Sequence, residues 1–114
     1  MRVDLSSHFP KLAACYDSPR VELLHRDAAL WAEEAVRSGD AFDVVIVDST
    51  DFGSSDPLHT PTFYGLLRQL AAKGVVVINL TSLSWNLAGA QDTVLMHASV
   101  GFQHVAVYQV FQPT

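Results

Sequence analysis

The chain has 114 residues, 49% of them hydrophobic, which is enough to bury one core, so we expect a single domain over residues 1–114. Its 12 acidic and 7 basic residues give a formal net charge of -5, which argues against nucleic acid or an anionic membrane surface as the main partner. A single cysteine, Cys15, excludes an internal disulfide framework, and no apolar run is long enough to span a bilayer. A soluble cytoplasmic protein is therefore the default expectation.

The first half of the chain predicts a strand, a helix and a second strand. Residues 20–24 alternate apolar and polar side chains as a strand does, and Asp27 is placed to cap the helix that follows. We predict this helix over residues 28–37, ended by Ser38-Gly39-Asp40. Its inner face is expected to comprise Ala28, Trp31, Ala32 and Ala35. Residues 42–47 are so apolar that we expect a strand buried on both faces.

The second half continues the alternation of helix and strand. Thr60 and Pro61 are typical of a helix start, and apolar residues recur at helical spacing until Lys73-Gly74. Residues 75–78 predict a strand, residues 85–100 a helix, and residues 104–111 a last strand. For the helix over 85–100 we expect an inner face of Leu87, Val94, Leu95 and Ala98. This order predicts parallel strands joined by right-handed crossovers, the later part of a doubly wound α/β sheet, with a last strand that is either parallel or antiparallel.

Aspartates are concentrated around the strand at residues 42–47. Between Ser38 and Leu67 there are five of them and no lysine or arginine: Asp40, Asp43, Asp48, Asp51 and Asp56. Because ligands of open parallel sheets bind beyond the carboxyl ends of the strands, Asp48 is placed where chemistry is usually done. Uncompensated carboxylates suit a cation, either an organic amine or a divalent metal. The alternative is a solvated capping turn, which we favour for Asp56 but not for Asp48.

Several other site types lack their usual residues. The six glycines are scattered, so no glycine-rich turn is present to approach phosphates or an adenosyl group. The five histidines lie on separate predicted elements without the spacing of a helical metal pair, and only His59 lies near the acidic loop. A magnesium site at the acidic loop ranks third, below two interpretations given at the end of this section. The reason is that the loop has no phosphate-binding residues beside it. We expect no metal.

Five segments together resemble a known family. They are Phe9-Pro10 through Tyr16, residues 20–28, residues 42–51, residues 58–64, and Pro113-Thr114. In order and spacing they resemble the second half of spermidine synthase and related polyamine aminopropyltransferases. The specific part is Asp48-Ser49-Thr50-Asp51, preceded by its apolar strand and followed by the aromatic pair Phe63-Tyr64. The implied fold is a Rossmann-like, class I methyltransferase-like sheet.

The resemblance also implies roles for individual residues. Asp48 matches the catalytic acid that holds the attacking amine of a diamine such as putrescine, and Asp51 matches its partner in the amine site. Asp27 matches the acid that receives the adenine amino group of decarboxylated S-adenosylmethionine, with Ala28 beside it. Tyr64 and Asn79 stand where the family has an aromatic residue and a diamine-contacting glutamine. The implied donor is a co-substrate that leaves as methylthioadenosine, and no tightly bound cofactor is implied.

The chain also departs from the family. Arg26 replaces a glycine beside the adenine-binding acid, and the loop after Asp51 is one residue shorter. The first half of the family domain, with its glycine-rich loop, is absent, so we expect a partial domain whose open sheet edge favours a homo-oligomer, such as a dimer. Activity of these 114 residues alone is doubtful. The alternatives are a methyltransferase-like domain that uses S-adenosylmethionine, or a non-catalytic, self-associating fragment.

Overall fold

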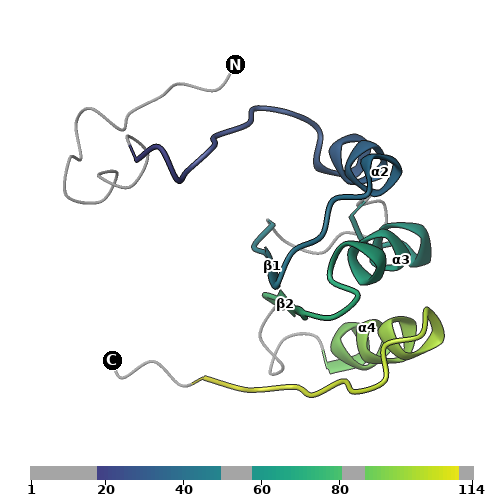
Figure 1. Cartoon of the computed structure of the whole chain (residues 1–114). Coiled ribbons are helices and arrows are strands. Elements are labelled where there is room, and N and C mark those ends of the chain that lie inside the picture. Colours follow the sequence, from purple (N-terminus) through teal and green to yellow (C-terminus); the bar gives the residue numbers. More distant parts are fainter. Residues whose placement is uncertain (1–17, 50–57, 81–86, 111–114) are drawn as a thin grey trace.

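The computed structural model describes residues 18–49, 58–80 and 87–110. In chain order these residues form α2 (Ala28–Ser38), β1 (Val44–Val47), α3 (Pro61–Leu70), β2 (Val75–Ile78) and α4 (Leu87–Ser99), as Figure 1 shows. The two strands pair in parallel, with Val44 opposite Val75 and Val47 opposite Ile78. The predicted α/β class and the parallel pairing are confirmed. The wider doubly wound arrangement stays a prediction, because the described residues supply two strands of it.

Both ends of α2 follow from its sequence. The Asp27 carboxylate accepts hydrogen bonds from the backbone N–H groups of Ala29 and Leu30, at 2.9 Å and 3.1 Å, and so satisfies donors that the first turn cannot pair. At the other end Gly39 adopts a left-handed conformation with φ of 77°. That conformation costs glycine little because it has no Cβ. The predicted start and end of this helix are confirmed.

The helix α3 is fixed by its cap and by its apolar face. The Thr60 hydroxyl accepts a hydrogen bond from the Phe63 N–H at 3.1 Å, and Pro61 occupies the first turn, where its missing N–H costs nothing. Phe63, Leu67 and Leu70 are buried, as their spacing predicts. This helix therefore presents its apolar face to the core along its whole length.

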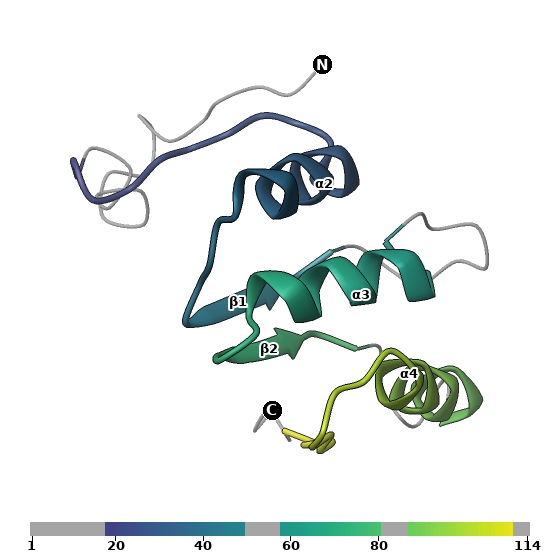
Figure 2. The same cartoon turned by 45° about the vertical axis from the view of Figure 1, so that its right-hand side comes forward.

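The helices α2, α3 and α4 lie on one side of the β1–β2 sheet (Figures 1 and 2). The core between them is formed by Ala32, Ala35, Phe63, Tyr64, Leu67 and Leu70. The sheet contributes alternate side chains to this core, namely Val45, Val47, Val76 and Ile78. The side chains between them, such as Ile46, point to the other side and are exposed. Our prediction of a β1 strand buried on both faces is therefore wrong for these residues, because the described part of the chain supplies no second layer over the sheet.

Two predicted strands are not formed. Residues 20–24 and residues 104–110 have no regular secondary structure and are exposed. A strand needs a neighbour to pair its backbone N–H and C=O groups, and the alternation of side chains alone does not supply one. Residue 111, the end of the predicted last strand, lies outside the described residues.

The inner face of α4 also differs from the prediction. The helix itself forms over Leu87–Ser99, within the predicted range, but Leu87, Leu95 and Ala98 are exposed and Val94 is half-buried. The buried residues are Ala90 and Thr93. Apolar residues are spread around this helix, so its sequence does not define a single face. Packing against α3 instead decides which residues of α4 are buried.

Gly74 allows the turn between α3 and β2 to approach the start of β1. A Cβ at this position would lie 2.3 Å from the carbonyl oxygen of Asp43 and 2.7 Å from that of Phe42. The adjacent N–H of Val75 donates to the Asp43 carbonyl at 2.9 Å, which sets the register of the two strands. The close backbone contact requires glycine here.

Candidate functional site

Asp48 and Asn79 come together at the carboxyl ends of the paired strands. They directly follow Val47 and Ile78, which face each other in the ladder, and the backbone N–H of Asn79 donates to the Val47 carbonyl at 2.9 Å. The side-chain amide of Asn79 then donates to Oδ1 of Asp48, also at 2.9 Å. This contact joins positions 31 residues apart in the sequence. The register of the sheet therefore builds a carboxylate–amide pair at the edge where ligands of parallel sheets bind.

Asp48 is exposed, and the N-caps of α2 and α3 are Asp27 and Thr60. Within the described residues the hydrogen-bond partner of Asp48 is the side-chain amide of Asn79, a donor that carries no positive charge. Among the ion pairs of the described residues, those of Arg26 and Arg37 go to glutamates of α2 and not to Asp48. The second predicted amine-site acid, Asp51, lies outside the described residues.

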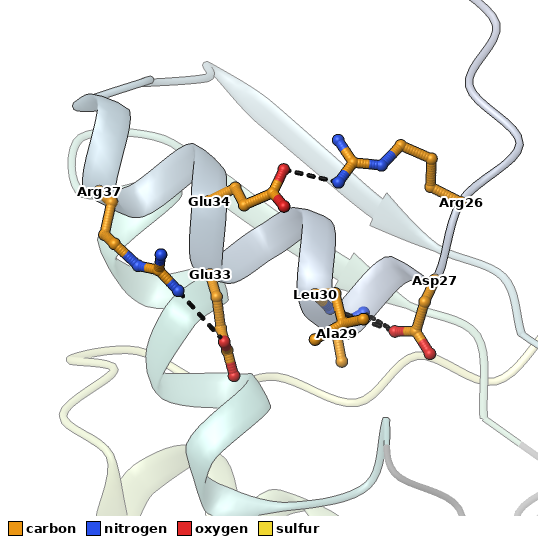
Figure 3. A network of polar contacts seen from close by, with 7 residues as sticks. All are labelled: Arg26, Asp27, Ala29, Leu30, Glu33, Glu34 and Arg37. Carbon is orange, nitrogen blue, oxygen red and sulfur yellow. Dashed lines mark hydrogen bonds and ion pairs between the residues drawn. The ribbon is translucent and has the colours of Figure 1, made fainter.

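Asp27 and Ala28, the residues predicted to bind the adenine, lie at the start of α2 (Figure 3). Oδ1 of Asp27 holds the first turn, and Ala28 is the first residue of the helix. The neighbouring Arg26 turns toward α2, where its guanidinium contacts Glu34 at 2.6 Å. The Arg26 side chain therefore runs along α2.

Tyr64 is fully buried in the core. Its hydroxyl shares a hydrogen bond with Nδ1 of His59, and its ring stacks on His97 with centroids 4.1 Å apart and planes 18° apart. Phe102 packs edge-on with His97, with ring centroids 5.4 Å apart. The predicted contact of Tyr64 with substrate stays a prediction; in this structure the residue packs α3 against α4.

This aromatic cluster was not foreseen from the sequence. Its members come from α3, α4 and the segments next to them, and no spacing rule connects residues so far apart. The Nδ1 of His97 donates to the Thr93 carbonyl at 2.8 Å, which fixes the ring. Burial lowers the pKa of His97 below its ordinary value of 6.5; the Thr93 carbonyl opposes this shift and the nearby His59 adds to it.

A cavity of about 110 Å³ lies between β2, α4 and residues 102–107. It is lined mainly by apolar side chains, including Val76, Ile78 and Phe102, and neither Asp48 nor Asn79 lines it. Within residues 18–49, 58–80 and 87–110, no three His, Cys, Asp or Glu side chains are grouped as metal ligands would be. In the same residues no helix is long and apolar enough to cross a membrane.

Comparison with known proteins gives a consistent result. The model of the spermine/spermidine synthase domain matches residues 3–114, nearly the whole chain. The chain belongs to the spermine/spermidine synthase family. This membership confirms the resemblance seen in the acidic segment after β1, and it is consistent with a Rossmann-like fold.

The relatives of this synthase-family chain are named polyamine aminopropyltransferase. The protein of Pyrobaculum aerophilum is 34% identical over 117 residues, which cover 98% of this chain and 40% of the relative. That of Pyrobaculum calidifontis is 32% identical over the same shares. That of Ruegeria sp. is 40% identical over 79 residues, 66% of this chain and 27% of the relative. The chain thus spans about two fifths of the length of its Pyrobaculum relatives. No solved structure matches it.

Proposed function

We propose that this chain supplies the amine-binding part of an aminopropyltransferase site, with Asp48 as the catalytic carboxylate. The observation that carries the proposal is the Asp48–Asn79 pair at the carboxyl ends of the two strands. An exposed carboxylate held by a neutral amide has a fixed direction, and the amide brings no positive charge of its own to the pair. Both properties suit a protonated amine such as one end of putrescine.

The reaction would be the transfer of an aminopropyl group from decarboxylated S-adenosylmethionine to the diamine. The amine nitrogen attacks the propyl carbon next to the sulfonium, the carbon–sulfur bond breaks, and its electron pair stays on sulfur in methylthioadenosine. A free alkylamine with a pKa of about 10 is protonated at neutral pH and must lose a proton before it attacks. That first proton passes to water, and a second one leaves the nitrogen as the new bond forms, so the amine product is neutral when formed and takes up a proton from water on release.

Asp48 would orient the nitrogen and accept a proton late, directly or through water, when bonding to carbon makes the nitrogen more acidic. Asn79 would hold the carboxylate by Oδ1 and leave Oδ2 directed to the amine. Asp51 would help to neutralise the cation. Asp27 and Ala28 would contact the adenine of the donor, and Tyr64 would be the aromatic residue of the substrate site.

Calorimetry with putrescine tests the proposal. We expect saturable binding, and we expect Asp48→Asn to weaken it by at least about tenfold because a charge-assisted contact is lost. The matched control is Asp43→Asn, which removes the same charge next to the amino end of β1. Equal effects of the two variants would show a general charge effect and contradict the proposal.

The donor gives a second test of the same site. Heat released with S-adenosylmethionine and none with putrescine or methylthioadenosine would favour a methyltransferase. No response to any of the three ligands would favour a non-catalytic fragment. We expect putrescine and methylthioadenosine each to bind.

A further inference from the structure

The helix α4 meets α3 at a titratable side chain. The imidazole of His97 stacks on the ring of the fully buried Tyr64, and Phe102 packs edge-on with the same imidazole. The fully buried residues of α4 are Ala90 and Thr93, both of which are small. A ring that can take up a proton near neutral pH therefore forms part of the contact between the two helices.

The surroundings of His97 favour the neutral ring. A cation is attracted to the face of the Tyr64 ring, but the imidazole loses water on packing there, and this loss outweighs the attraction. No carboxylate of the described residues offsets the loss. The titratable or charged side chains around His97 in that part of the chain are His59 and Tyr64, the Arg68 guanidinium, which donates to the Gly101 carbonyl, and His104 across the cavity.

The position of α4 allows it to separate without loss of the core. The helix α3 lies between α2 and α4, so α3 is the helix that α4 packs against within the described residues (Figures 1 and 2). The fully buried core cluster comes from α2 and α3, and α4 adds the half-buried Met96 at its edge. Segments that bury few side chains open at a lower free energy than the whole domain unfolds.

From this geometry we infer that the stack of His97 on Tyr64 is a pH-sensitive switch. The neutral imidazole holds α4 against α3, and its protonation releases α4 while α2, α3 and the β1–β2 sheet stay folded. In the released helix the ring is in water and binds a proton more readily than in the docked helix, so a fall in pH below 6.5 favours release. The inference does not depend on the proposed roles of Asp48 and Asn79.

Release of α4 would uncover side chains next to the candidate site. His97 lines the cavity between α4 and β2, and the strand side of this cavity includes Ile78 and Leu80. These two residues precede and follow Asn79 in the chain. The switch would therefore act on the surface that supports the end of β2.

Hydrogen exchange followed by NMR tests the inference on the 114-residue chain. Rates are compared at pH 7.5 and pH 5.0 after correction for the intrinsic effect of pH on exchange. We expect the protection of residues 90–99 to fall by more than about threefold at the lower pH, and that of residues 28–38 in α2 to change by less than about twofold. The imidazole proton shifts of His97 should titrate over the same pH range.

Two substitutions identify the group responsible. His97→Phe keeps the stacked ring but cannot titrate, so the difference between the two pH values in α4 should disappear. His97→Gln, which is neutral at both values, should give the same result and serves if the phenylalanine variant does not fold. The matched control is His104→Gln, which removes an exposed histidine that lines the same cavity and should retain the wild-type difference.

Three outcomes would overturn the inference. The first is equal protection of α4 at the two pH values in the wild type. The second is a loss of protection by the same factor in α2 and α4, which would show unfolding of the whole domain. The third is a pH-dependent loss in α4 that persists in the His97 variants, or whose range differs from the titration of His97 in the wild type.

Discussion

The side-chain amide of Asn79 donates a hydrogen bond of 2.9 Å to Oδ1 of Asp48, across the carboxyl ends of two paired strands. The contact depends on the register of the sheet, because Val47 and Ile78, the residues before them, are ladder partners. A shift of one residue would turn one of the two side chains to the other face. The contact between Asp48 and Asn79 therefore depends on how β1 pairs with β2. Removing the Asn79 amide tests what this contact does.

Asn79→Ala should weaken putrescine binding by about fivefold, since loss of one hydrogen bond to an exposed carboxylate is worth about 1 kcal/mol. Calorimetry measures the change. The control is Gln91→Ala, which removes an exposed amide from α4. An Asn79→Ala variant with wild-type affinity would show that the amide does not position Asp48.

Asp27 combines a structural contact with a predicted role in donor binding, and two substitutions separate them. Asp27→Ala should lower the free energy of unfolding by about 1 kcal/mol, because the N–H groups of Ala29 and Leu30 lose their acceptor. Asp27→Ser should keep most of that stability, since serine is also a good cap. Urea unfolding checks both values.

If Asp27 also binds the adenine amino group, methylthioadenosine should bind more weakly to Asp27→Ser, although that variant stays folded. Unchanged binding of methylthioadenosine would limit Asp27 to its capping role.

Gly74→Ala should destabilise the protein by about 1–3 kcal/mol, the usual range for forcing extra atoms into a packed region. The new Cβ would collide with the Asp43 and Phe42 carbonyls. The matched control is Gly65→Ala in the middle of α3, where no atom lies within 4 Å of the added Cβ. That change should stabilise the helix by about 0.5–1 kcal/mol. Thermal unfolding of the two variants should therefore shift in opposite directions.

His97 should make stability depend on pH. Burial holds its pKa below 6.5 in the folded protein, so the unfolded chain binds the proton more readily. Its contribution to stability is complete above pH 6.5 and is lost as the pH falls from 6.5 through the folded pKa. Urea unfolding between pH 5 and pH 8 should show this decline.

His97→Phe keeps an aromatic ring against Tyr64 and Phe102 but cannot titrate, so its pH dependence should be weaker than that of the wild type. His25→Gln removes an exposed histidine instead and should retain the wild-type decline. Equal pH dependence in His97→Phe and the wild type would exclude His97 as the source.

The sequence by itself determined the local features of this protein. Asp27 and Thr60 cap the helices that they were predicted to cap, and Gly39 ends α2, because capping depends on a few neighbouring backbone groups. The two Val/Ile runs are strands, and Asp48 follows the first of them, because an apolar run and its end are visible in the residue order.

Tertiary structure alone decided which surfaces are covered. Packing against α3 buries Ala90 and Thr93 of α4 in place of the predicted Leu87 and Leu95. Tertiary structure also decides that Ile46 is exposed and that residues 20–24 form no strand. Burial and strand pairing both require another part of the molecule to lie alongside. The contacts of Asp48 with Asn79 and of Tyr64 with His97 are equally non-local. They exist because sheet register and helix packing bring distant residues together, and no local pattern encodes that.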